Sequence, residues 1–222
     1  MTALLRYHTA LLLRSQRWLP PVLLYAAFLG IGVRPGEPVL GALGWTAAGL
    51  LPVTAWLVRV CLNQEPAAAR HVTAAAAGRE RVHLTAIGAA TVCAGLMGAA
   101  AVAAVTALGA PVNAGREVLV PRLPAALAGL VTAAVCVLLG AAVGALGTRP
   151  LVRARAWSIS VIAVAALLAL VTAGSPARQA VTALVTGSRT GTVEHPWTAL
   201  AGAVALAAVA VALACRLTAR RE

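Results

Sequence analysis

The chain carries few side chains of the kinds that perform chemistry, and their spacing does not bring them together. All 18 of its basic residues are arginine and all six acidic residues are glutamate. Without aspartate it cannot form the aspartate pair of an intramembrane protease, and without lysine it cannot form the phosphate-binding loop GxxxxGK[ST]. We therefore predict no catalytic residue, no bound cofactor and no ATP hydrolysis by this chain itself.

The cysteines and histidines do not have the spacing of metal ligands. Each cysteine stands alone in or beside an apolar run, with no CxxC pair, and no histidine is placed near enough to complete a ligand set. We predict that the cysteines are small core residues and that there is no metal site. The residues are Cys61, Cys93, Cys136, Cys215, His8, His71, His83 and His195.

Glu194 and His195 are an acid and a base in adjacent positions. General acid–base catalysis would need a substrate or nucleophile within hydrogen-bonding reach, and the sequence offers no nucleophile near this pair. We do not expect a catalytic site there.

The composition is that of a membrane protein. Hydrophobic residues make up 61% of the chain and charged residues only 11%, which is outside the range of soluble domains. The net charge of +12 could indicate nucleic-acid binding, but the arginines are scattered between apolar runs, so we expect no nucleic-acid partner. Because aromatic residues are only 4%, we expect helices that pack through small residues, at spacings such as Gly140 with Gly144 or Gly95 with Gly98.

Six apolar segments approach the length of about 20 residues that is needed to cross a bilayer. We predict an all-α membrane protein whose residues 1–222 form a single transmembrane domain with six transmembrane helices. The first is short, and it is expected to stay in the protein because no small-x-small cleavage site follows it. No glutamate lies in the middle of a segment, which disfavours ion-coupled transport. The segments are residues 18–33, 39–62, 84–110, 124–147, 157–174 and 197–215.

The arginines predict the orientation, because positive residues remain on the cytoplasmic side of a membrane. A cytoplasmic N-terminus leaves thirteen arginines inside and five outside, so we expect both termini in the cytoplasm. The Arg-only, Ala-rich composition is typical of a high-GC bacterial genome, and we expect a bacterial plasma membrane. The inside arginines are Arg6, Arg14, Arg17, Arg59, Arg70, Arg79, Arg81, Arg149, Arg153, Arg155, Arg216, Arg220 and Arg221, and the outside ones are Arg34, Arg116, Arg122, Arg178 and Arg189.

Two segments on the cytoplasmic side could carry function. Residues 2–17 form an imperfect amphipathic pattern, which predicts an interfacial helix or an extension of the first span. Residues 63–83 predict a short helix between Pro66 and Gly78, with a charged docking surface. The alternative for that segment is an ordinary charged loop. The docking residues are Arg70, His71, Arg79, Glu80 and Arg81.

Residues 175–196 form a third segment, on the outer side. Its apolar part, residues 177–185, is too short to span a bilayer. It could form a helix that lies at the outer interface or dips into the membrane, where protein contacts would have to satisfy its backbone. A flexible connector is the alternative.

In the arrangement of these segments the chain resembles the membrane permease of a type-2 ATP-binding cassette (ABC) exporter. An interfacial elbow helix precedes span one in that family, here RYHTALLLRSQRWLPPVLLYAAFLGIG. A cytoplasmic coupling helix lies between spans two and three, here AAARHVTAAAAGRERVHLTAI, and short outer helices lie between spans five and six, here SPARQAVTALVTGSRTGTVEHPW. The resemblance covers the whole chain, and two departures are the short first span and the weakly apolar outer segment.

The resemblance implies two permease subunits, identical or related, which dock on two ABC ATP-binding subunits. ATP and magnesium would bind to those partners, while this chain would contact them and the surrounding lipids. The substrate would be hydrophobic or amphipathic: a peptide, an antibiotic or a lipid. Two alternatives remain. A non-transporting membrane subunit or immunity-type protein would bind a lipid or peptide without ATPase, and a lipid-modifying membrane enzyme is disfavoured by the missing carboxylates.

Overall fold

The computed structural model describes residues 1–148 and 155–221, and the regular structure of these residues is helical. Residues 149–154 and 222 lie outside this part, and so do the predicted cytoplasmic positions of Arg149 and Arg153. The helices are α1 (Thr2–Ser15), α2 (Leu19–Gly32), α3 (Val39–Asn63), α4 (Ala67–Ala77), α5 (Arg79–Leu108), α6 (Arg122–Leu146), α7 (Arg155–Val171), α8 (Pro176–Thr190) and α9 (Trp197–Arg221).

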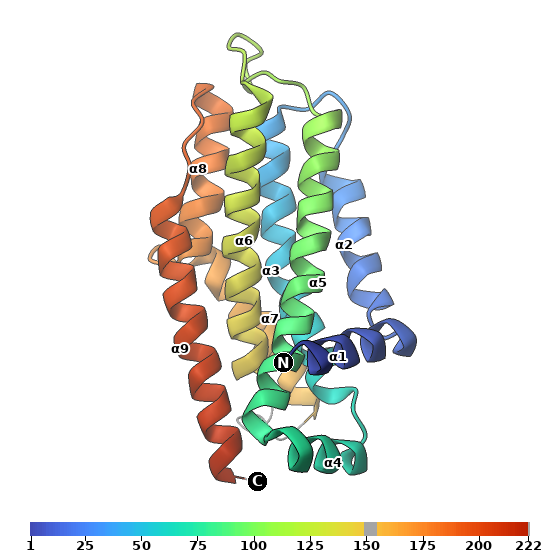
Figure 1. The fold of residues 1–222 in the computed structure, drawn as a ribbon. Helices are drawn as coiled ribbons and strands as arrows, with labels where there is room; N and C mark the ends of the chain where they lie inside the picture. The colour runs from blue at the N-terminus through green and yellow to red at the C-terminus, as the bar shows by residue number, and fades with distance from the viewer. Residues whose placement is uncertain (149–154, 222) are drawn as a thin grey trace.

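Four of these helices, α3, α5, α6 and α9, are long and apolar enough to cross a membrane. Helices α7 and α8 meet at an angle of 50°, and together they have the length and composition of a fifth, broken span or of a re-entrant loop. Helix α2 is apolar but has only 14 residues. The long helices run side by side, and α1 and α4 lie across the lower end of the bundle (Figure 1). The chain is therefore a multi-pass α-helical membrane protein.

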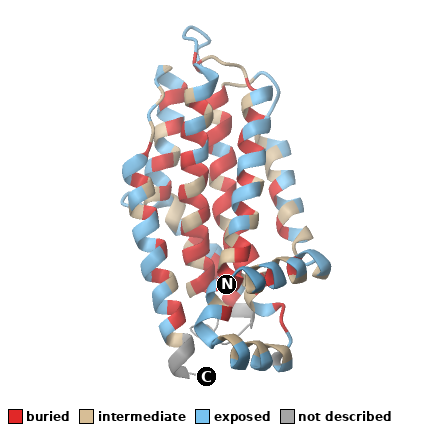
Figure 2. Cartoon of the chain, in the orientation of Figure 1, coloured by how far each residue is buried: buried red, intermediate tan, exposed pale blue. Residues whose placement is uncertain are grey.

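Helices α3 and α6 form the centre of the bundle. Within their most apolar windows, 61% of α3 and 67% of α6 is buried inside the protein, against 28% of α5 and 33% of α9. Figure 2 shows the same distribution, with buried residues concentrated on the central helices. Because α5 and α9 bury only one side against protein, their other sides face the surrounding medium.

Two glycines set the distance between α3 and α6. A Cβ at Gly140 would lie 2.5 Å from the carbonyl oxygen of Leu51, and one at Gly144 would lie 2.8 Å from that of Ala55. The two backbones approach too closely for any side chain, which confirms the prediction for this pair. The predicted pair of Gly95 and Gly98 does not act together, because only Gly98 faces α3.

Helix α2 packs on α3 through aromatic residues. The rings of Phe28 and Trp45 are stacked with their centroids 4.3 Å apart, and Trp45 Nε1 donates to the carbonyl oxygen of Phe28 at 3.0 Å. The hydroxyl of Tyr25 donates to the carbonyl oxygen of Thr46 at 3.1 Å. These bonds fix the short α2 against the first half of α3.

The helix ends differ from the predicted boundaries mainly where a helix continues beyond the apolar run. Helix α5 begins at Arg79, five residues before the predicted third span, because Gly78 separates it from α4 and the residues that follow are good helix formers. Helix α9 continues past residue 215 to Arg221 for the same reason. The remaining predicted spans agree with α2, α3, α6 and α7 to within about three residues.

The outer segment is a helix, and the alternative of a flexible connector is wrong for residues 176–190. Helix α8 turns away from α7 and packs along α3 and α6 in the upper half of the bundle (Figure 1). Ser175 caps it, since its Oγ accepts from the backbone N–H of Ala177 at 3.3 Å. Gly191 ends it in the left-handed conformation, φ +81°. Ala180 and Leu184 are fully buried, so α8 belongs to the packed bundle.

Candidate functional site

The lower end of the bundle carries the predicted docking helix. Helix α4 runs over the predicted residues, Ala67–Ala77. Pro66 precedes it as the N-cap rather than occupying the first helical position. Gly78 follows at φ +85°, a conformation that a side chain rarely adopts, and this lets the chain turn directly from α4 into α5. The sequence thus builds a short helix joined to α5 by a single residue.

The predicted docking residues divide into two groups. His71 on α4 and the first-turn residues of α5, Arg79, Glu80 and Arg81, are exposed. Arg70 is half-buried, and its Nη2 donates to the carbonyl oxygen of Glu65 at 3.1 Å. Its guanidinium therefore contacts the chain's own backbone and is less available to a partner than the exposed residues. Val72 on α4 is 69% exposed, which adds an apolar contact point to this charged surface.

Glu65 joins α1 to α4, and sequence reasoning missed it. Its carboxylate is 5% exposed, and Oε1 accepts from the hydroxyl of Tyr7 on α1 at 3.1 Å and from Oγ1 of Thr73 on α4 at 3.2 Å. A buried carboxylate is stable only when such donors compensate its lost hydration. The two helices are therefore held together at the end of α3 by one charged group. Tyr7 and Glu65 are 58 positions apart, so no local pattern could have paired them.

His8 is the second buried polar residue of this junction. Its ring is 1% exposed, and within the described residues neither of its nitrogens has a hydrogen-bond partner. Burial lowers the pKa of His8 below its ordinary value of 6.5, and the nearby charge of Glu65 opposes this only in part. Gln64 Nε2 donates to the carbonyl oxygen of His8 at 3.5 Å. Docked α1 therefore contains a neutral histidine. In the sequence, the one sign of this buried polar residue is that a histidine stands among the leucines of α1.

The break between α7 and α8 brings polar groups into the length of the bundle. Residues 171–174 are exposed, and an Nη of Arg178 donates to the carbonyl oxygen of Val171, the last residue of α7. One turn further along α8, the carbonyl oxygen of Val181 lies 3.7 Å from the position of a Cβ at Gly44 of α3. Arg178 therefore lies about 12 Å below the start of α3, counted as five residues along α3 and three along α8 at 1.5 Å per residue.

Helix α3 has 25 residues, so Arg178 lies about a third of the way along it. Arg178, which the sequence predicts on the outer side, thus lies beside α3 rather than beyond its end. Wherever lipid chains surround this part of the bundle, an exposed arginine and an exposed turn require protein or water beside them.

The outer loops are joined to the end of α8. Asn113 Nδ2 donates to the carbonyl oxygen of Arg189 at 3.3 Å, and its Oδ1 accepts from the backbone N–H groups of Glu117 and Val118 at 2.9 and 3.1 Å. The backbone N–H of Ala114 donates to the carbonyl oxygen of Ser188 at 2.6 Å. These bonds close the upper end of the bundle around α8. Glu194 is exposed, and the rings of His195 and Trp197 are stacked with their centroids 6.2 Å apart.

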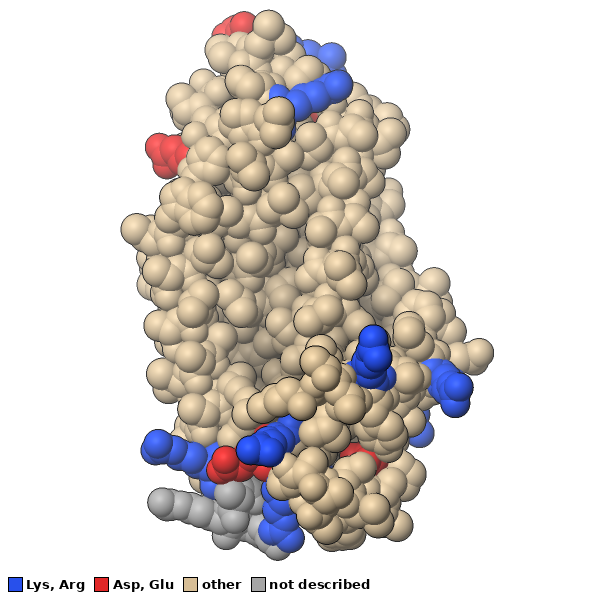
Figure 3. Space-filling model, viewed as in Figure 1, with Lys and Arg blue, Asp and Glu red and all other residues tan. Residues whose placement is uncertain are grey.

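Charged side chains gather at the two ends of the molecule (Figure 3). The described residues contain no cluster of three or more potential metal ligands. Cys61, Cys136 and Cys215 are buried and Cys93 is partly buried, and all four are free thiols, which confirms three of them as core residues.

In comparisons with protein-family models, with curated proteins and with solved structures, the chain has no match.

Proposed function

We propose that the chain is the membrane permease subunit of an ATP-driven type-2 ABC exporter in a bacterial plasma membrane, with both termini cytoplasmic. In this proposal α2, α3, α5, α6, the broken pair of α7 with α8, and α9 are the six spans, α1 is the elbow helix and α4 is the coupling helix. Two such subunits, identical or related, bind two ATP-binding subunits. The observation that carries the proposal is the position of α4, a short helix with an exposed face at the end of the bundle where most arginines lie.

The contacts of α4 account for how force would reach the spans. A push on the exposed residues His71 and Val72 would act on α5 through Gly78, which is the only residue between the helices. It would act on α1 and on the end of α3 through Glu65, which accepts hydrogen bonds from both interfacial helices. The ATP-binding partner supplies ATP and magnesium, and the role of this chain is to transmit the movement.

The break between α7 and α8 supports a pathway on that side of the bundle. The turn at residues 172–174 and the side chain of Arg178 are exposed beside α3. In this proposal they lie within the membrane, where they need water or a second permease. Such a position between two subunits would be wet when the pathway is open. The otherwise apolar surfaces suit a hydrophobic or amphipathic substrate, such as a peptide, an antibiotic or a lipid.

The proposal is tested by purifying the tagged chain from its native membrane, identifying a copurified ATP-binding subunit and measuring ATPase activity of the complex in proteoliposomes. Replacing Arg79, Glu80 and Arg81 with alanine should reduce substrate-stimulated ATPase at least tenfold. The matched control replaces Arg34, Arg116 and Glu117, which changes the same charges at the opposite end and should leave ATPase unaltered.

Unchanged ATPase in the Arg79–Arg81 variant would refute the docking surface. Purification without any ATP-binding subunit, together with protection against a toxic peptide that persists in ATP-depleted cells, would instead favour the non-transporting, immunity-type protein.

A further inference from the structure

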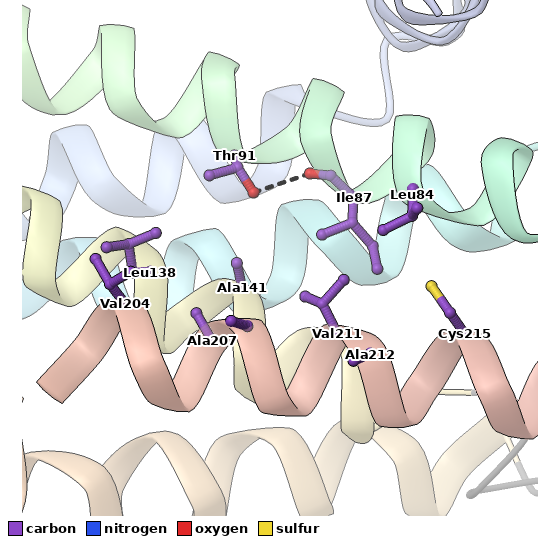
Figure 4. A pocket seen from close by; sticks show the side chains of 11 residues that line it. Leu84, Ile87, Thr91, Leu138, Ala141, Val204, Ala207, Val211, Ala212 and Cys215 are labelled. Atoms are coloured by element: carbon purple, nitrogen blue, oxygen red, sulfur yellow. Dashed lines mark hydrogen bonds between the residues drawn. The ribbon is translucent and has the colours of Figure 1, made fainter. Parts of the chain in front are cut away.

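An apolar groove runs along the outer surface of the bundle between α5, α6 and α9 (Figure 4). Its volume is about 450 Å³. Thr91 is the one hydroxyl residue in its wall, and its Oγ1 donates to the carbonyl oxygen of Ile87 at 2.9 Å, so the groove presents hydrocarbon to its contents. The other lining residues are Leu84, Leu138, Ala141, Val204, Ala207, Ala208, Val211, Ala212 and Cys215.

The groove has the length of one lipid leaflet. Val204 at one end and Cys215 at the other are eleven residues apart on α9, which corresponds to about 16 Å. Half of a bilayer's hydrocarbon is about 15 Å thick. A second hollow of about 390 Å³ between α5 and α6 shares Thr91 and Leu138 with the first and continues it along α5. An extended acyl chain from one leaflet fits this shape.

Charged groups stand only at the lower end of the groove. Leu84 is one turn from Arg81 and Glu80, and Cys215 is followed by Arg216. Glu80 lies close enough to Cys215 for its charge to act on that thiol. Arg81 and Arg216 are both exposed, and Arg79 adds a third positive charge against the single glutamate. Figure 3 shows mixed charges at the bottom of this face and an uncharged surface above them.

We propose that this groove binds one anionic phospholipid from the leaflet on the side of α4. One acyl chain lies between α5, α6 and α9, and the phosphate contacts Arg81 and Arg216. The charge complementarity selects an anionic headgroup, because the described residues at the mouth carry a net positive charge. The small side chains of the alanines that line the groove leave the space that the acyl chain fills. The site shares Arg81 with the docking surface of the proposed function, but its test measures lipid retention and needs no ATP-binding subunit, so the two proposals fail separately.

The test is native mass spectrometry of the purified chain in detergent, incubated with equal amounts of phosphatidylglycerol and phosphatidylcholine. The wild-type chain should retain one phosphatidylglycerol. Ala208→Phe and Ala212→Phe place rings in the groove from exposed positions of α9, and each should lower retention about tenfold, the cost of one lost chain contact of about 1.4 kcal/mol. Ala205→Phe, an exposed position of the same helix outside the groove, should retain the lipid.

Arg81→Gln combined with Arg216→Gln should remove the preference for phosphatidylglycerol, by about fivefold for each arginine, while a lipid is still retained. Helical circular dichroism and a monodisperse elution profile confirm that each variant is folded. Lipid retention is measured separately for Ala208→Phe and for Ala212→Phe. Equal retention in the Ala205, Ala208 and Ala212 variants would overturn the site. An unchanged headgroup preference in the arginine variant would overturn the anionic lipid. A dimer that Ala208→Phe dissociates, with no lipid retained, would show that a second copy occupies the groove.

Discussion

The junction at Glu65 yields the most informative prediction. Glu65→Ala removes the acceptor of the hydrogen bonds from Tyr7 and Thr73, and leaves Arg70 with its bond to the backbone. Because the carboxylate is the only group that contacts both α1 and α4 in this way among the described hydrogen bonds, its loss should weaken the docking of α1 at the end of α3, although α1 keeps its packing on α5 and the bond from Gln64 to His8. The spans themselves do not depend on it and should remain folded.

The size of the effect follows from the contacts. A hydrogen bond to a charged group contributes about 1.5–3 kcal/mol when fully buried. Tyr7 is 39% exposed and Thr73 keeps a second acceptor, the carbonyl oxygen of Arg70 at 3.1 Å, so water and the backbone offset part of both losses. About 2 kcal/mol in total remains, which corresponds to a change of about 30-fold in the equilibrium between docked and undocked α1. Glu65→Gln keeps a neutral acceptor and should cost about half as much.

Hydrogen exchange of the backbone amides measures this equilibrium directly. A detached helix of this length is marginal in water, so α1 should exchange about 30-fold faster in Glu65→Ala, while α6 exchanges as before. Glu194→Ala, at an exposed carboxylate near the opposite end, is the control and should leave α1 protected.

A double-mutant cycle with Tyr7→Phe decides whether the bond itself is responsible. Tyr7→Phe should speed exchange of α1 in the wild-type background and add little once Glu65 is alanine. Equal effects of Tyr7→Phe in both backgrounds would refute the reasoning, because the two side chains would then act independently.

Three further predictions test other parts of the structure. Burial lowers the pKa of His8, so undocked α1 binds a proton more readily than docked α1. Docking of α1 should therefore hold above about pH 6.5 and weaken below it. Hydrogen exchange of α1, compared at about pH 7.5 and about pH 5.5, should show this weakening in the wild type but not in His8→Leu. Gly140→Ala should lower the free energy of unfolding by about 1–3 kcal/mol, and with it the unfolding temperature, because the new Cβ would meet the Leu51 carbonyl oxygen. Gly95→Ala has open space around it and should melt like the wild type. Equal melting curves for the two variants would contradict the close approach of α3 and α6. Arg178→Cys, in a background without native cysteines, should react with a water-soluble maleimide faster than Leu168→Cys, which is exposed on α7. Reaction of both positions at the same slow rate would place Arg178 in lipid and contradict the prediction.

The sequence by itself determined the protein's class and most helix ends. Long apolar runs can exist only as membrane helices, since every backbone group must be satisfied within the segment. Pro66 and Gly78 define α4 because their effects on the backbone are local. Even the small-residue pair Gly140 and Gly144 could be recognised, although the equally plausible pair at Gly95 could not be told from it.

Only the tertiary structure decided which surfaces meet. The spans are so uniformly rich in alanine, valine and leucine that lipid-facing and protein-facing sides look alike in sequence, because a lipid chain is as apolar as a leucine. The pairing of Tyr7 with Glu65, the packing of α8 beside α3, and the groove between α5 and α9 all join residues that are far apart along the chain. Each of these contacts depends on how the helices pack together. That packing is set by the sum of many weak contacts, and no single residue in the sequence identifies it.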